Sequence, residues 1–379
     1  MKIFRYFAVV LGIFVLSENS ANAQPSVFSA QRAAEDLQAA TLALSEAQKA
    51  KDRVAALSQV IRAYEDGLQA MREGLRKAAI REKSLRLEFA ARRDQLSRLL
   101  GVLQTLQRAP APLLLIHPSG PMGTARSGQI LTDVTPALHR QAEDLRAQLE
   151  ELLVLQALQT SAEEDIRLGL QGAQNARVAL AAAIGSRTQL PKRVLSDPEK
   201  LKMLSENSET LTGFANGLSD LPFDGAPVDA PAFAQSKGTL DLPLFGTVLR
   251  GYNEADAAGL RRPGLVLSAP PVTLVTAPFP ATIRFRGAFL DYGKVIILEP
   301  EAGFLIVLAG LGQVYGDVGE ILAKGDPVGL LGGEDAAAGD FLREASQGSG
   351  VTRQETVYIE IRQNGEPVDP TDWFRLNDR

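Results

Sequence analysis

The segment ETVYIEIRQNGEPVDPTDWF, residues 355–374, ends a C-terminal region whose short apolar runs decide the fold. Upstream of it, glycine and proline separate further runs of the same kind, a pattern typical of strands in a compact all-β domain. The runs are GLVLSA, TLVTAP, ATIRFRG, KVIILEP, FLIVLAG, PVGLLGG and TVYIEIR. We therefore predict an all-β domain over residues 240–379.

The N-terminal half has a different periodicity, that of long helices. Apolar residues recur at alternating steps of three and four from Val54 to Leu106, and Glu82 and Arg92 interrupt the series. Such spacing, with charged residues elsewhere, indicates a coiled coil. No proline lies between Pro25 and Pro110. We therefore expect one helix of about 75 residues in this part of the chain.

A segment rich in proline and glycine near residues 108–128 breaks this pattern, which resumes at Leu138 and continues to Ile184. A second helix that returns along the first would cover both apolar stripes and give an antiparallel coiled-coil hairpin over residues 24–190, with its tip near 108–128. Pairing with a second chain is the alternative, because it would also cover the stripe.

Residues 191–239 are predicted to form a regulatory helix followed by a linker. Ser196 is the expected N-cap, and Pro198 then falls in the first turn, where proline is tolerated. The linker, residues 219–239, is rich in Pro, Ala, Gly and Asp and is expected to run over a surface. The apolar face of the helix consists of Leu201, Leu204, Leu211, Phe214 and Leu218. The fold class is therefore α+β multidomain, a long antiparallel coiled-coil hairpin followed by an all-β domain.

The first 23 residues have the pattern of a secretory signal peptide. Lys2 and Arg5 precede a short apolar run, and Ala-Asn-Ala ends at Ala23, after which we expect cleavage. The run is shorter than the ~20 residues that a membrane span requires. We expect the mature chain to lie in the periplasm.

Composition excludes two classes of function. The formal net charge is -5, and no Lys/Arg-dense face offsets the carboxylates, so a nucleic-acid partner is not expected. The chain has no cysteine, which rules out disulfides and thiolate chemistry.

Residues 240–374 resemble a LytM (lysostaphin-type) zinc metallopeptidase domain. GLVLSAPPVTLVTAPFPATIRFRGAFLDYGKVIILEPEAGFLIVLAGL follows that family's order of strands and glycine turns. VGEILAKGDPVGLLGG matches its next hairpin, and TVYIEIRQNGEPVDPTDW matches its final strand. The resemblance covers the whole C-terminal third of the chain.

The same resemblance implies a zinc site, but the chain lacks the ligands. The family's first histidine and its aspartate fall on Arg262 and Val266, and its His-x-His pair falls on Thr356 and Tyr358. A further assisting histidine falls on Gly310. Zinc requires imidazole, carboxylate or thiolate ligands. An arginine repels a cation, so we predict no zinc, no cofactor and no catalysis.

Other catalytic arrangements are also not supported. The only histidines, His117 and His139, lie in the helical region, so a Ser–His or Cys–His nucleophile system is excluded in the β domain. Four carboxylates lie in or beside predicted turns and are interpreted as solvated charges, namely Asp291, Glu299, Glu320 and Glu360.

The whole architecture resembles the EnvC-type murein hydrolase activators. In that family the degenerate LytM domain cuts nothing. Its vacant groove binds and activates N-acetylmuramoyl-L-alanine amidases, which split septal peptidoglycan during cell division. The coiled coil docks on the extracytoplasmic part of an FtsEX-type ABC transporter, and an arm with the linking helix covers the groove until the transporter acts. The resemblance implies the same partners and the same autoinhibition here.

The residues expected to bind the partner are Arg262, Tyr292, Tyr358 and Arg362. Residues two apart face the same side of a strand, so Tyr358 and Arg362 share one face. Tyr and Arg concentrate binding energy at interfaces. Two other classes stay open. One is a structural module whose groove binds peptidoglycan without an amidase, and the other is a hydrolase with chemistry that the sequence does not show.

Overall fold

The computed structural model describes residues 24–47, 49–94, 97, 101, 104, 120–185, 192–195, 197–221, 223–224, 232–257, 259–334 and 354–376. The chain divides into two compact units. The first comprises Met1–Met71, Ile166–Phe341 and Gly350–Arg379, and the second Arg72–Asp165 and Leu342–Ser349. The predicted signal peptide and residues 108–119 of the predicted tip lie outside the described residues.

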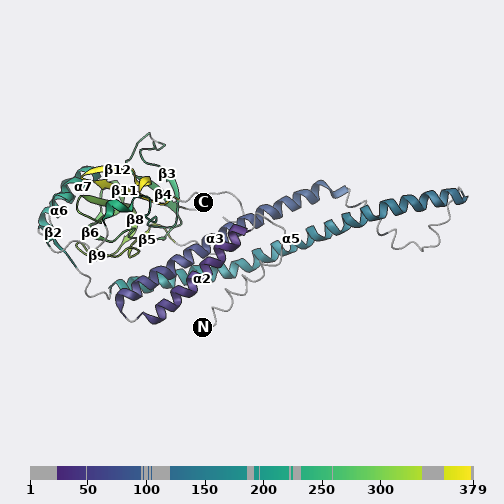
Figure 1. The fold of residues 1–379 in the computed structure, drawn as a ribbon, viewed down its shortest axis with the longest axis horizontal. Helices are drawn as coiled ribbons and strands as arrows, with labels where there is room; N and C mark the ends of the chain where they lie inside the picture. The colour runs from purple at the N-terminus through teal and green to yellow at the C-terminus, as the bar shows by residue number, and fades with distance from the viewer. Residues whose placement is uncertain are drawn as a thin grey trace. The chain divides into compact units, whose positions relative to one another are not determined.

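Three long helices form the N-terminal region, α2 (Gln24–Glu46), α3 (Ala50–Ala91) and α5 (Gly120–Gly185) (Figure 1). The expectation of one helix of about 75 residues was wrong, because α2 ends before α3 begins. Leu37 of α2 and Val54 of α3 belong to the same apolar cluster. Asp52 lies in the first turn of α3, where a negative charge is favourable.

Helices α3 and α5 run antiparallel wherever they touch inside the first unit. The Nη2 atom of Arg177 lies 3.1 Å from Oε1 of Glu65. A Cβ on Gly169 would lie 3.1 Å from the side chain of Leu68, so residue numbers fall on one helix as they rise on the other. The complete coiled-coil hairpin stays a prediction, because residues 105–119 are not described. Residues 120–128, which were predicted to belong to the tip, form the start of α5 instead.

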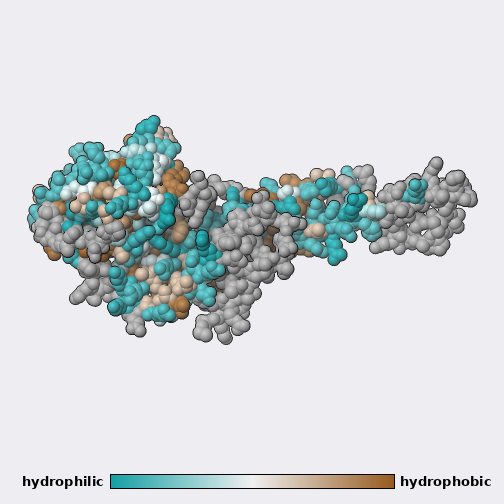
Figure 2. Space-filling view, in the orientation of Figure 1, coloured by the Kyte–Doolittle hydropathy of each residue, from teal (hydrophilic) through white to brown (hydrophobic). Residues whose placement is uncertain are grey.

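The second unit contains the distal parts of the same two helices. Nε of Arg81 lies 2.6 Å from Oε1 of Glu151. Glu82, which interrupts the predicted apolar seam, is buried and accepts a hydrogen bond of 2.9 Å from Nε2 of Gln159. On the face shown in Figure 2, hydrophilic residues predominate over the described surface.

The C-terminal region is an antiparallel β domain, as predicted. Its main sheet has the order β3-β4-β11-β8-β7-β6-β9, while β10 pairs with β5 and β8, and β12 pairs with β11. Each of the seven predicted runs contains a strand, and the sequence did not predict β3 and β12. The hairpin expected over residues 318–333 is not formed, because β9 pairs with β6 while β10 pairs with β5 and β8. The strands are β3 (Thr247–Arg250), β4 (Leu265–Ala269), β5 (Leu274–Thr276), β6 (Ala281–Ala288), β7 (Lys294–Glu299), β8 (Phe304–Val314), β9 (Ile321–Leu322), β10 (Pro327–Leu331), β11 (Glu355–Gln363) and β12 (Glu366–Val368).

The central strands are apolar on both faces. In β7, Ile296 belongs to the main core of the domain, whereas Ile297 belongs to a second cluster on the opposite face. In β8, Ile306 and Val307 divide in the same way. This alternation explains why these strands appear as continuous apolar runs, and it means that both faces of the sheet require a cover.

The main core includes a residue from the predicted surface linker. Phe233, in the short helix η3 (Phe233–Ser236), is fully buried. Its ring stacks on Trp373 with centroids 4.5 Å apart, and Phe279 and Phe304 contact it edge-on. The C-terminal end of residues 219–239 is therefore not a surface linker, because this aromatic cluster holds it in the core.

The predicted regulatory helix is two helices, α6 (Pro198–Asn207) and α7 (Leu211–Ser219). Asp197, not Ser196, caps α6 by accepting a hydrogen bond of 2.9 Å from the backbone N of Lys200. Thr210 caps α7 in the same way, 3.1 Å from the backbone N of Gly213. This second N-cap explains why the apolar stretch does not continue as one helix.

Within the first unit, α3 contacts the β domain through Glu65. Its carboxylate accepts a hydrogen bond of 3.0 Å from the backbone N of Leu274 in β5 and pairs with Arg177 of α5. Burial raises the pKa of Glu65 to about 6, although Arg177 and the Leu274 N–H oppose the shift. Two other helix residues contact this edge, since Arg62 donates to Oγ1 of Thr276 and Leu57 packs in a cluster with Tyr315.

Phe233→Ala should destabilise the β domain by about 3–5 kcal/mol, because it removes a fully buried aromatic ring. Trp373 is the only tryptophan, so its fluorescence reports unfolding in denaturant. Phe245→Ala is the matched control, since Phe245 is 38% exposed. Equal losses of stability in the two variants would contradict the assignment of Phe233 to the core.

Glu65→Gln should remove a pH dependence of stability between about pH 4.5 and 6. With the folded pKa raised to about 6, the folded chain binds a proton that the unfolded chain releases, so stability falls as the pH rises through this window. The expected loss is about 2 kcal/mol. Denaturant unfolding at a series of pH values tests this, with Glu73→Gln as an exposed control on the same helix. A slope that persists in Glu65→Gln would refute it.

Candidate functional site

One face of the sheet is covered by α7. We call this the α7-covered face, and it consists of Phe285, Phe289, Val295, Ile297, Leu305, Val307, Ala309 and Tyr358. Phe214 of α7 is fully buried there, with its ring stacked on Phe289 at 4.6 Å and edge-on to Phe285 at 4.7 Å between centroids. Leu211 and Leu218 are buried on either side of it. The apolar face predicted for this helix is thus the face that meets the sheet.

Helix α6 contributes less to this contact. Leu201 and Leu204 are only partly buried against the cluster, and α6 has no fully buried residue. Gly217 of α7 lets the two helices approach, because a Cβ there would lie 2.5 Å from Cδ1 of Leu204. Helix α7 is therefore the main cover, and α6 packs against the same cluster through Leu201 and Leu204.

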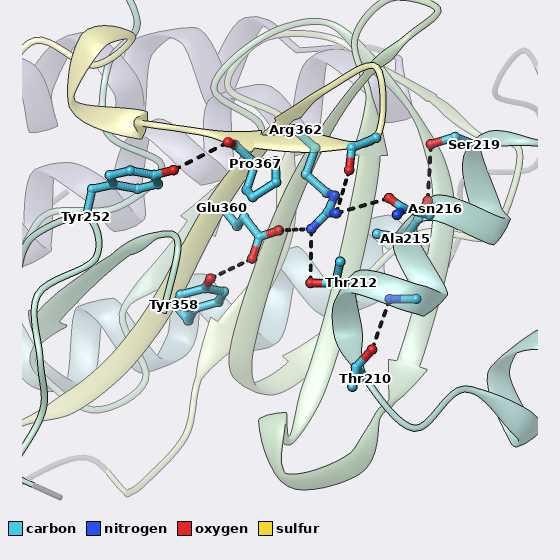
Figure 3. A network of polar contacts seen from close by, with 12 residues as sticks. Thr210, Thr212, Ala215, Asn216, Ser219, Tyr252, Tyr358, Glu360, Arg362 and Pro367 are labelled. Atoms are coloured by element: carbon cyan, nitrogen blue, oxygen red, sulfur yellow. Dashed lines mark hydrogen bonds and ion pairs between the residues drawn. The ribbon is translucent and has the colours of Figure 1, made fainter. Parts of the chain in front are cut away.

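A buried polar network lies beneath α7 on β11 (Figure 3). The hydroxyl of Tyr358 donates to Oε2 of Glu360 at 2.5 Å, and Glu360 forms an ion pair with Arg362. Arg362 also donates to Oδ1 of Asn216 at 3.0 Å and to the Gly365 carbonyl at 2.6 Å. The strand thus contacts α7 through polar side chains as well as through apolar packing.

The electrostatics of this network correct the prediction for Glu360. That carboxylate is not solvated, because its side chain is 2% exposed and sits between Tyr358 and Arg362. Burial and the adjacent Glu360 raise the pKa of Tyr358, so its hydroxyl keeps its proton and acts as the donor. A charged pair buried this deeply is retained only when its hydrogen bonds are satisfied. The contact to Asn216 makes α7 one of its supports.

The four residues predicted to bind a partner lie in one continuous set of contacts. Arg262 is exposed, and its guanidinium carbon lies 5.3 Å from the centre of the Tyr292 ring. The Tyr292 ring lies 5.9 Å from that of Tyr358, from which the contacts continue to Arg362 through Glu360. Arg262 and Tyr292 are accessible, whereas Tyr358 and Arg362 are buried while α7 is in place.

The positions predicted to correspond to zinc ligands also converge here. Val266 of β4 and Ala309 of β8 are the cross-strand neighbours of Tyr358. Gly264 makes room for the Tyr358 ring, since a Cβ at Gly264 would lie 2.6 Å from it. Gly310 has a φ of +90°. A Cβ on Gly310 would lie 2.7 Å from the Thr356 carbonyl oxygen, so no larger side chain fits without a shift of the backbone.

These residues do not fit a zinc ion. Among the described residues, no three His, Cys, Asp or Glu side chains lie close enough together to hold a metal. Arg262 carries a positive charge, and the hydroxyl of Tyr358 is already bonded to Glu360. Valine and glycine offer no ligand atom.

A second polar contact at the C-terminal end of α7 was also missed from the sequence. Arg284 of β6 is buried and donates to the carbonyls of Leu218 and Leu221. Its Nη1 atom lies 3.4 Å from Oε2 of Glu299, which the sequence reading took as a solvated charge. The signal that could have revealed Arg284 is its position inside the run ATIRFRG, where an arginine falls between residues that are otherwise apolar.

Comparison with known proteins shows a peptidase M23 (LytM-type) domain. The model of Peptidase family M23 matches residues 261–370. The murein hydrolase activator EnvC of Escherichia coli (strain K12) is 26% identical over 138 residues, 36% of this chain and 29% of that protein. An uncharacterized protein of Neisseria meningitidis is 25% identical over 146 residues, 38% of this chain and 22% of that protein. The chain therefore spans less than a third of the length of these curated relatives.

Solved structures are similar at low identity. Csd3 of Helicobacter pylori is 19% identical with a TM-score of 0.27, covering 36% of this chain and 34% of that one. Lysostaphin is 16% identical with a TM-score of 0.26, covering 33% of this chain and 48% of that one. Among the described residues, no helix has the length and apolar character that a membrane span requires.

Asn216→Ala should loosen α7, because Arg362 loses a charge-assisted hydrogen bond, whereas Asn216→Asp should hold α7 at least as firmly through an ion pair. We expect amide hydrogen exchange in residues 211–219 to become about tenfold faster in Asn216→Ala. Asn207→Ala, at the exposed end of α6, is the matched control. Unchanged exchange in Asn216→Ala would show that this contact does not hold the helix.

Proposed function

We propose that this protein is a non-catalytic activator of N-acetylmuramoyl-L-alanine amidases that split septal peptidoglycan during cell division. The observation that carries the proposal is an M23 domain in which Arg262, Val266 and Tyr358 stand at the predicted zinc-ligand positions, with Tyr358 joined to Glu360 and Arg362 in a buried network. The similarity to EnvC, although limited to 36% of the chain, supports the same role. We propose the periplasm as the site of action, which the signal-peptide pattern of the first 23 residues supports.

The absence of catalysis rests on the chemistry of the side chains. Hydrolysis by this fold needs a metal-bound water, and the aligned positions offer an arginine, a valine and a tyrosine bonded to a carboxylate. The described part of the β domain has no histidine that could act as a general base. A binding role is what the remaining residues support, since arginine and tyrosine suit a protein interface.

We also propose that α7 is autoinhibitory, which its position over the sheet supports. Tyr358 is 6% exposed and Arg362 1% exposed while the helix is in place, so a partner cannot reach either. Each large apolar side chain buried by α7 contributes about 1.5–3 kcal/mol. A net preference of only ~3 kcal/mol for the closed form would leave less than about 1% of molecules open. Activation therefore requires that something displace the helix.

We propose that movement of the predicted coiled-coil hairpin displaces α7 from the sheet. We propose that the hairpin binds the extracytoplasmic part of an FtsEX-type ABC transporter, as the similarity to EnvC suggests. The base of the helical region contacts the β domain through Glu65 and Arg62, so movement of these helices has a physical route to the sheet. A change in the transporter would thus be converted into opening of the α7-covered face.

Phe214→Asp in the mature chain should raise amidase activation several-fold, because a buried carboxylate cannot be held between Phe285 and Phe289. Release of dye from labelled sacculi by a purified amidase measures this effect. Met203→Asp is the matched control, since Met203 of α6 is 60% exposed and its change should leave activation at the basal level.

The same assay tests the partner-binding residues once α7 is displaced. Arg262→Ala should lower the activation gained by Phe214→Asp, whereas Arg261→Ala, at the adjacent exposed arginine, should not. If Phe214→Asp gives no activation of any amidase and the protein instead sediments with isolated sacculi, the activator role is wrong. The structural wall-binding module would then be the better description.

A further inference from the structure

Residues 192–195, between α5 and α6, form a short strap on the edge of the sheet. Lys192 makes a β-bridge with Glu320, and the backbone N of Arg193 donates to the Gly319 carbonyl at 2.9 Å. The Nζ atom of Lys192 lies 3.1 Å from Oδ2 of Asp317 and 3.4 Å from Oε1 of Glu320. The strap is therefore fixed beside β9. After it the chain enters α6 and α7, which together we call the helical arm.

The strap is also tied to the far end of that arm. Val194 and Leu195 form β1, which pairs antiparallel with β2, residues Phe223 and Asp224. Helices α6 and α7 lie between these two strands in the sequence. A displacement of the strap consequently acts on both ends of the arm at once.

One carboxylate oxygen links the strap to the sheet interior. Oε2 of Glu299 lies 3.1 Å from Nη1 of Arg193 and 3.4 Å from Nη1 of Arg284. The side chain of Glu299 is 14% exposed, that of Arg193 is 16% exposed and that of Arg284 is 3% exposed. Water therefore screens the charges of this cluster only weakly. Two positive charges thus share one negative charge.

The charge distribution acts on Arg284 from two directions. Burial lowers the pKa of Arg284, and while Glu299 opposes that shift, Arg193 adds to it by repulsion. Arg193 also occupies part of the hydrogen-bonding capacity of Glu299. The guanidinium of Arg284 is thereby left available to the Leu218 and Leu221 carbonyls at the end of α7.

Those two carbonyls lie at and just beyond the end of α7, which is Leu211–Ser219. The Leu218 carbonyl also accepts a hydrogen bond of 3.2 Å from the backbone N of Leu221, so Arg284 is an additional donor there. The C-terminal end of a helix carries partial negative charge, which the guanidinium of Arg284 compensates. If the guanidinium moves toward Glu299, the end of the helix loses this charge and one of its donors.

We infer that Arg193, Glu299 and Arg284 form a relay that couples the strap to α7, so that detaching Arg193 from Glu299 loosens the helix. With Arg193 in place, Glu299 is shared and Arg284 holds α7. With Arg193 removed, Glu299 interacts with Arg284 alone and draws it from the helix end. Arg193 is a positioning residue in this relay, acting on α7 through Glu299.

This inference deepens the proposed function, because it takes α7 as the inhibitory element. The coupling itself is a property of the folded chain and needs no amidase. The coupling also gives a movement of α5 a defined place to act on the β domain, because the strap follows the segment that leaves α5. Movement of that helix would reach α7 through the charges on Arg193 and Glu299.

The test is amide hydrogen exchange in the full mature chain. Arg193→Gln should make exchange in residues 211–219 about tenfold faster, which corresponds to about 1.4 kcal/mol, while β11 keeps its protection. Arg193→Lys keeps the charge near Glu299 and should restore most of the protection. Lys192→Gln, which removes an equal charge from the same strap but not from Glu299, should leave α7 at the wild-type rate.

Two results would overturn the relay. One is wild-type exchange of α7 in Arg193→Gln, and the other is equal acceleration in Lys192→Gln and Arg193→Gln. Amidase activation in the same variants tests the proposed function separately. If α7 loosens in Arg193→Gln while activation stays basal, the relay stands and the inhibitory role of α7 falls.

Discussion

Phe214 has no exposed surface, and its ring contacts the rings of Phe285 and Phe289. The α7-covered face of the sheet depends on this contact. The central strands place apolar residues on both faces, so the sheet cannot be stable in water with one face bare. The main core covers one face, and α7 covers the other. Any partner that takes the place of α7 must therefore offer apolar surface of similar size, or the exposed face will favour return of the helix.

The polar network gives this contact its orientation. A buried ion pair contributes little net stability, because desolvation offsets the attraction between its charges. Glu360 and Arg362 nevertheless have fixed partners in Tyr358, Asn216 and Gly365. A helix that lacked an acceptor opposite Arg362 would leave a buried guanidinium short of a partner, at a cost of about 1–3 kcal/mol. Apolar packing thus supplies the affinity for α7, and the network selects the register in which it binds.

Much of this arrangement follows from local sequence signals. The seven apolar runs gave seven strands, and the apolar face of residues 198–218 proved to be the face that meets the sheet. The break between α6 and α7 could have been read from Thr210, a good N-cap in the middle of the stretch. The burial of Glu360 could not be predicted so simply. Its own partners, Tyr358 and Arg362, are near in sequence, but Asn216 of α7, which contacts Arg362, lies 146 positions away in the chain. The break between α2 and α3 could not be predicted, because residues 47–49 include no proline or glycine.

The site also differs from a zinc centre by more than its ligands. Gly310 has a positive φ, and the Thr356 carbonyl oxygen occupies the space that its Cβ would need. The Tyr358 ring fills the room above Gly264, and Glu360 and Arg362 extend the network toward α7. Replacing single residues by histidine would therefore not rebuild a metal site, because the backbone near Gly310 and the Tyr358 ring would both have to move. In this structure the same strand anchors α7, through the contact of Arg362 with Asn216.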